Sequence, residues 1–207
     1  LQTLVLDGTG SFDPEGGPIT DYLWEMTDAP QDVVTGPVPF TGDPGNNALR
    51  QFRLPIAGRY VFQLNVFDEN GFPACEVAEV AGVATPTEAI TVELVWQTPG
   101  DPDEADDEGS DLDLHFVKMP ARWFDGQFDT YFSNTEPNWN PELPSLDIDD
   151  TDGAGPETIQ LDNPQSGQCY AIGVHYFREA FGIAYPTVRV FTDGTLVAEY
   201  IGQVEDT

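Results

Sequence analysis

Short apolar runs that alternate with polar residues limit the fold of this 207-residue chain more than any other feature. In the clearest run, Arg59–Phe67, the residues Tyr60, Phe62, Leu64 and Val66 share one face of an extended strand. Further runs of this kind are Leu4–Leu6, Ile19–Met26, Glu76–Val83, Ile90–Trp96, Leu112–Val117, Tyr170–Phe177, Thr187–Phe191 and Leu196–Ile201. The 20 Gly and 18 Pro fall largely between them. This pattern predicts an all-β chain of two antiparallel β-sandwiches.

The stretch ATPTE at residues 84–88 separates two of these runs and marks the predicted domain boundary, with domains 1–86 and 87–207. The first domain holds 12 acidic and 3 basic residues, and the second holds 25 acidic and 4 basic ones. Because the charge is concentrated in the second domain, we expect the two domains to have different roles.

The formal net charge of -30 excludes nucleic acid and anionic membranes as binding partners, since both repel such a chain. A charge of this size also destabilises the folded chain through repulsion among its own carboxylates. Either bound cations or adaptation to a salty medium would compensate for this repulsion. No apolar stretch reaches the roughly 18–20 residues of a transmembrane helix. We expect an exported, extracellular or cell-surface protein, whose targeting segment lies upstream of this sequence.

Residues 6–24 (LDGTGSFDPEGGPITDYLW) and 58–71 (GRYVFQLNVFDENG) resemble the PKD (polycystic kidney disease) domain. The resemblance implies an immunoglobulin-like sandwich with a buried Trp24, used as a spacer or interaction module. It also implies that Asp13, and with it Asp68, are candidate calcium ligands. From the residues alone, an Asx turn explains Asp13 among turn-forming glycines better than metal binding does.

The first of two acidic stretches is DPDEADDEGSDLD at residues 101–113, which runs directly into an apolar strand. In an extended strand Asp111, Asp113 and His115 share one face, and the apolar residues between them share the other. Ca²⁺ prefers six to eight oxygen ligands in a tolerant geometry. We therefore predict Asp111 and Asp113 as calcium ligands.

The second acidic stretch is LDIDDTDGAG at residues 146–155, where Asp147, Asp149, Asp150 and Asp152 lie within six residues. Carboxylates packed this closely repel one another, and a divalent cation relieves the repulsion. The spacing is not that of an EF-hand. The sequence predicts Ca²⁺ at these four residues too, with two solvated acidic loops as the alternative.

The blocks SDLDLHF, SLDIDDTDGAGPETI, YAIGVHYF and PTVRVF resemble a poorly characterised β-sandwich module of predicted bacterial surface proteins and lipoproteins. This resemblance implies a sandwich at the cell surface but names no ligand. The partner expected from it is an unidentified protein or glycan on a surface.

An aromatic-rich loop at residues 123–140 suggests a second function, carbohydrate binding. Trp123, Tyr131 and Trp139 lie there among Asn, Asp and Pro residues, and such rings stack on sugars. The alternative is a long loop held to the sandwich by buried rings.

Catalysis is not expected, because nothing singles out an acid–base pair among the many carboxylates and no GxSxG or HExxH motif is present. A role as accessory domain of a secreted hydrolase is a remote alternative. A zinc site built on His115 and His175 would need carboxylate partners. Cys75 and Cys169 either form one disulfide between the two domains or stay free.

Overall fold

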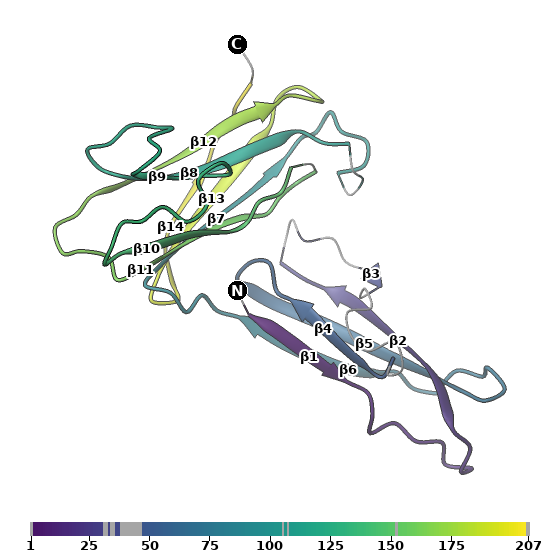
Figure 1. Cartoon of the computed structure of the whole chain (residues 1–207). Helices are drawn as coiled ribbons and strands as arrows, with labels where there is room; N and C mark the ends of the chain where they lie inside the picture. Colours follow the sequence, from purple (N-terminus) through teal and green to yellow (C-terminus); the bar gives the residue numbers. More distant parts are fainter. Residues whose placement is uncertain are drawn as a thin grey trace. The chain divides into compact units, whose positions relative to one another are not determined.

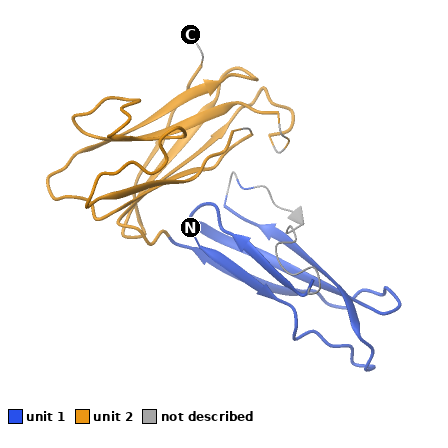
Figure 2. Ribbon diagram, viewed as in Figure 1, with its two compact units in different colours: residues 1–85 blue, residues 86–207 orange. Residues whose placement is uncertain are grey.

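In the computed structural model the chain folds into two compact units, residues 1–85 and residues 86–207 (Figures 1 and 2). The structure describes residues 2–30, 33, 36–37, 47–104, 106, 108–151 and 153–205. The regular elements of these residues are strands in antiparallel pairs, which confirms the all-β fold class. The unit boundary lies one residue before the predicted domain boundary. Within the described ranges, no helix has the length and hydropathy of a membrane span.

The first unit contains a two-stranded sheet of order β1-β4 and a four-stranded sheet of order β3-β2-β5-β6 (Figure 1). Its strands are β1 Thr3–Asp7, β2 Ile19–Asp28, β3 Gly36–Pro37, β4 Leu49–Arg53, β5 Gly58–Asp68 and β6 Ala78–Ala84.

The core of the first unit forms around Trp24 of β2 and the alternating residues of β5. Trp24 is buried, and its Nε1 donates a hydrogen bond to the carbonyl of Ala48 at 3.3 Å. Tyr60 and Phe62 are fully buried, and the Tyr60 hydroxyl donates to the carbonyl of Ile56 at 2.8 Å. The predicted inward face of this strand and the predicted burial of Trp24 are confirmed.

The second unit is a sandwich of a five-stranded sheet, β10-β11-β7-β13-β14, and a three-stranded sheet, β12-β8-β9. Its strands are β7 Ile90–Gln97, β8 Asp111–Lys118, β9 Asp129–Thr130, β10 Leu143–Ile148, β11 Glu157–Asp162, β12 Tyr170–Arg178, β13 Tyr185–Thr192 and β14 Thr195–Ile201. The nine predicted runs all correspond to strands, whereas β3, β4, β9, β10 and β11 were not predicted as runs.

Alternate residues of β7 and β8 meet between the two sheets of the second unit. The core cluster includes Val92, Leu94, Trp96, Leu112, Leu114, Phe116, Ile159 and Leu161. Because side chains along a strand point to opposite faces in turn, the polar residues of β8 lie on the face away from this core. That outer face of β8 positions the candidate site.

Candidate metal centre

The outer face of β8 carries Asp111, Asp113 and His115, so the predicted sharing of one face is confirmed. All three are nevertheless buried, with exposed fractions of 6%, 3% and 2%. Burying ionisable groups is costly unless hydrogen bonds, opposite charges or a metal compensate. The groups around these three side chains therefore show which kind of compensation this face uses.

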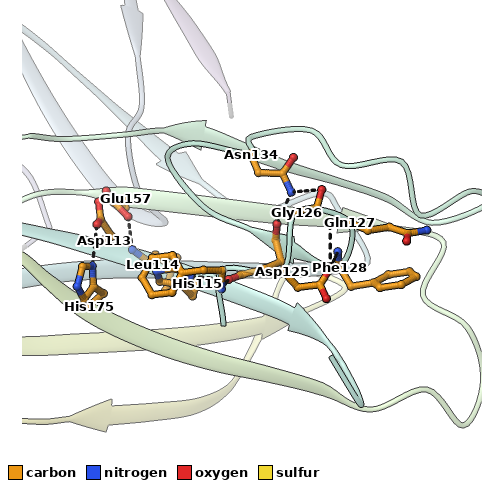
Figure 3. A network of polar contacts seen from close by, with 12 residues as sticks. Asp113, Leu114, His115, Asp125, Gly126, Gln127, Phe128, Asn134, Glu157 and His175 are labelled. Carbon is orange, nitrogen blue, oxygen red and sulfur yellow. Dashed lines mark hydrogen bonds and ion pairs between the residues drawn. The ribbon is translucent and has the colours of Figure 1, made fainter. Parts of the chain in front are cut away.

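Glu157, the first residue of β11, brings a carboxylate from the other sheet to β8. The preceding turn lies on Trp96: Trp96 N donates to the carbonyl of Ala154 at 3.0 Å. Gly155 has a φ of +87°, and a Cβ on it would lie 2.8 Å from the Trp96 ring. The side chain of Glu157 then turns to β8, where Leu114 N donates to its Oε2 at 2.5 Å (Figure 3).

Asp113, Asp149 and Glu157 form what we call the acid group. One carboxylate oxygen from each lies within 4.8 Å of the other two. Glu157 has no exposed surface, and its Oε1 has no hydrogen-bond partner among the described residues. Asp149 is exposed, so the group is open to solvent on that side.

The pKa values of the acid group reflect this crowding. Burial, with the carboxylates of Asp113 and Asp149 adding to it, raises the pKa of Glu157 to about 10 against the opposing effect of the Leu114 N–H. Burial also raises the pKa of Asp113, although the hydrogen bond with His175 acts in the other direction. Burial and the charge of Asp113 raise the pKa of Asp111 to about 6, with Arg178 opposing. A cation at this position would remove the repulsion that these shifts reflect.

A second set of side chains, the histidine group, consists of Asp113, His115 and His175, again with one ligand atom from each within 4.8 Å of the others. His175 of β12 faces Asp113 across the strand pair, and its Nδ1 lies 3.2 Å from Asp113 Oδ2 (Figure 3). His115 Nδ1 lies 2.7 Å from Asp129 Oδ2. The acid and histidine groups share Asp113.

The structure brings only some of the predicted calcium ligands together. Asp113 and Asp149 belong to the acid group, and the negative charges of Asp149 and Asp150 act on Asp111 beside it. Asp147 is outside the group and accepts a hydrogen bond from Ser145 Oγ at 2.7 Å. Asp152 lies outside the described residues.

In the first unit, both candidate calcium ligands close turns. Asp13 accepts hydrogen bonds from the backbone N–H groups of Glu15 and Gly17, at 2.8 and 3.1 Å. Asp68 Oδ1 accepts from Asn70 N and Phe72 N at 2.8 Å each. The geometry of Asp13 is that of an Asx turn, the alternative to metal binding that the sequence offered.

Four residues of the site were not predicted as ligands, namely His115, whose place on the outer face of β8 was expected, and Glu157, His175 and Asp129. Glu157 follows the second acidic stretch in GPE but lies at the start of an unpredicted strand. His175 occupied an apparent strand interior, although its alternation with Val174 and Tyr176 places it on the polar face. Asp129 lies in the aromatic-rich loop, and no spacing in the sequence connects it with His115.

The aromatic-rich loop does not present the three proposed sugar-binding rings together. Trp139 is 2% exposed, stacks on Phe116 and Tyr170, and donates from Nε1 to the carbonyl of Gln127 at 2.8 Å. Its ring therefore offers no open face to a sugar. Tyr131 stacks on His115 at a centroid distance of 5.0 Å, and Trp123 remains 47% exposed.

Comparison with protein-family models, curated proteins and solved structures finds no match. The two family resemblances stay predictions from the sequence. Cys75 lies in the first unit and Cys169 in the second, and both are exposed. One disulfide or two free thiols stay the alternatives predicted from the sequence.

Proposed function

We propose that the second unit is a non-catalytic, calcium-binding module of an exported protein, with a spacer or adhesion role. The observation that supports this most strongly is Glu157. A fully buried carboxylate with an unpartnered oxygen, within 4.8 Å of the carboxylate oxygens of Asp113 and Asp149, is costly unless a cation or a proton resides there.

The ligand chemistry of the acid group favours Ca²⁺. All three donors are carboxylate oxygens, and the exposed side at Asp149 leaves room for water molecules to complete six to eight ligands. Mg²⁺ demands a tighter octahedron and keeps most of its own waters. Asp111 adds negative charge beside the group.

A site open to solvent suits a medium rich in calcium. Extracellular calcium modules function with dissociation constants of about 10⁻⁴ to 10⁻³ M. The formal net charge of -30 raises the local concentration of cations further. Both features agree with the exported location expected from the sequence.

The proposal is tested by calorimetric titration of the chelator-treated protein with Ca²⁺, together with thermal unfolding. A ligand of the native state at 100 times its dissociation constant stabilises it by about 2.7 kcal/mol, so the melting temperature of the second unit should rise. Asp149→Asn replaces one exposed carboxylate ligand with a neutral amide and should abolish most of this rise.

The matched control is Asp193→Asn, in the exposed turn between β13 and β14, where φ is +47° and Asn is well tolerated. This variant loses the same charge and should keep the full calcium effect. An unchanged melting temperature of the wild type in millimolar Ca²⁺ would contradict the proposal, and would indicate that Glu157 holds a proton instead.

A further inference from the structure

We propose that Asp113, His115 and His175 form a second metal site, for a first-row transition ion such as Zn²⁺, with Asp129 positioning His115. This site is distinct from the acid group in two of its three ligands and in its chemistry. It does not require that calcium binds.

The hydrogen bond between His115 and Asp129 fixes which imidazole nitrogen is available. Asp129 is fully buried, and its Oδ2 also accepts from Phe124 N at 2.6 Å, so it acts as an acceptor. His115 Nδ1 therefore donates to Asp129 at 2.7 Å. In the neutral ring the lone pair then resides on Nε2.

His115 Nε2 is one of three buried polar atoms at this face without a hydrogen-bond partner among the described residues; the others are Asp111 Oδ1 and Asp129 Oδ1. His115 itself is 2% exposed. A buried polar atom without a partner costs free energy, whether it carries a lone pair or a proton. A metal ion bound to Nε2 satisfies the lone pair.

Strand geometry supplies the other two ligands. Asp113 lies two residues from His115 on the same face of β8, and His175 faces Asp113 on β12 in the antiparallel register. One ligand atom from each residue lies within 4.8 Å of the others. Because all three residues come from two paired strands, the backbone holds the ligands in place before an ion binds.

The surroundings resemble those of a metal site in two further respects. Histidine ligands usually donate their second ring nitrogen to a carboxylate or carbonyl, which orients the ring and raises its basicity, and Asp129 does this here. Tyr131 stacks on the His115 ring and Phe124 meets it edge-on, which excludes water from that side. The His175 side chain is 42% exposed, so an ion can enter from that side.

The donor set selects the kind of ion. Two imidazole nitrogens and one carboxylate suit Zn²⁺ and neighbouring transition ions, whereas Ca²⁺ takes oxygen ligands. Three protein ligands leave a position for water. Asp113 is a member of both the acid group and the histidine group, and its carboxylate has two oxygen atoms with which to serve them.

The test is titration of the chelator-treated full chain with Zn²⁺ by calorimetry and with Co²⁺ by visible absorption. The wild type should bind an ion and show Co²⁺ ligand-field bands typical of nitrogen ligation. His175→Gln and His115→Gln should each weaken Zn²⁺ binding at least tenfold and remove these bands. His175→Gln changes a partly exposed residue, so it keeps the test decisive if His115→Gln fails to fold.

Two more variants separate the roles. Asp129→Asn should weaken Zn²⁺ binding by about 10- to 100-fold and shift the Co²⁺ bands, an effect that loss of stability alone does not produce. Asp193→Asn, which removes a negative charge from the exposed turn between β13 and β14, should leave Zn²⁺ binding unchanged. Absence of Zn²⁺ and Co²⁺ binding in the wild type, or full binding by a folded His175→Gln variant, would overturn the proposal without affecting the calcium proposal.

Discussion

Nδ1 of His115 lies 2.7 Å from Oδ2 of Asp129, and the two side chains are 2% and 0% exposed. The contact joins β8 to the first residue of β9 across the outer face of the smaller sheet. It fixes the orientation of the imidazole and directs Nε2 away from Asp129. The stability of the second unit and the geometry of the histidine group both depend on this pair.

Removing Asp129 should therefore destabilise the second unit. Asp129→Ala leaves His115 Nδ1 and Phe124 N without their acceptor in a buried place, and each buried donor left unsatisfied costs about 1–3 kcal/mol. Urea unfolding of the chelator-treated protein measures the effect. Glu136→Ala, at an exposed position of the same loop region, is the control and should change the free energy of unfolding by less than about 0.5 kcal/mol.

Glu157→Gln should have opposite consequences with and without calcium. The amide is neutral and keeps an oxygen for the Leu114 N–H, so in a chelator it should match or exceed the wild type in melting temperature. In millimolar Ca²⁺ the wild type should gain stability and the variant should not. A variant that follows the wild type in both conditions would remove Glu157 from the calcium site.

Glu142 provides a pH dependence independent of both metal groups. Burial raises its pKa, but hydrogen bonds from Lys118, from the Tyr170 hydroxyl and from Gln165 N outweigh burial and hold the pKa below the usual 4.5. A carboxyl with a lowered native pKa stabilises the fold above its unfolded pKa, and this contribution disappears as the pH falls through the native pKa.

We therefore expect Glu142→Gln to lower the free energy of unfolding at pH 7 by about 1–3 kcal/mol. The difference from the wild type should shrink as the pH falls below about 4.5. Urea titrations between pH 7 and pH 3 measure both quantities. A difference that stays constant over this range would show that the pKa of Glu142 is not lowered by folding.

The two tryptophans of the aromatic-rich loop should differ sharply in their effect on stability. Trp139→Ala removes a buried ring and its hydrogen bond to Gln127, which should cost about 3–5 kcal/mol. Trp123→Ala changes a ring that is 47% exposed and should cost clearly less. Thermal unfolding of both variants, with a glycan-array screen of the wild type and Trp123→Ala, also tests the sugar-binding alternative.

Much of the fold could be predicted because it depends on local pattern. The alternation of Tyr60, Phe62 and Leu64 predicted an inward strand face, since a strand must bury its apolar side. β4 (LRQFR) was missed because two of its five residues are arginines, so that it lacks an apolar run. β11 was missed because the first buried residue of its alternating pattern is a glutamate, Glu157, and not an apolar residue.

The candidate site was predictable only in part. The shared face of Asp111 and Asp113 could be predicted because alternate residues of one strand lie on the same side whatever the strand pairs with. Asp147 was expected beside Asp149, but β10 has an irregular register between Leu146 and Ile148. Asp147 contacts Ser145 instead of the acid group.

The sequence by itself determined nine of the strands, the two units, and the face of β8 that carries two aspartates and a histidine. Only the tertiary structure decided which groups meet there. His175 reaches Asp113 across 62 residues, and Glu157 reaches Leu114 across 43. Such contacts depend on strand register and sheet packing, which are fixed by the burial of Trp96 and its neighbours rather than by local preference. The same packing buries the carboxylates of Asp113 and Glu157. Because buried carboxylates need compensation, this part of the second unit is a candidate metal centre.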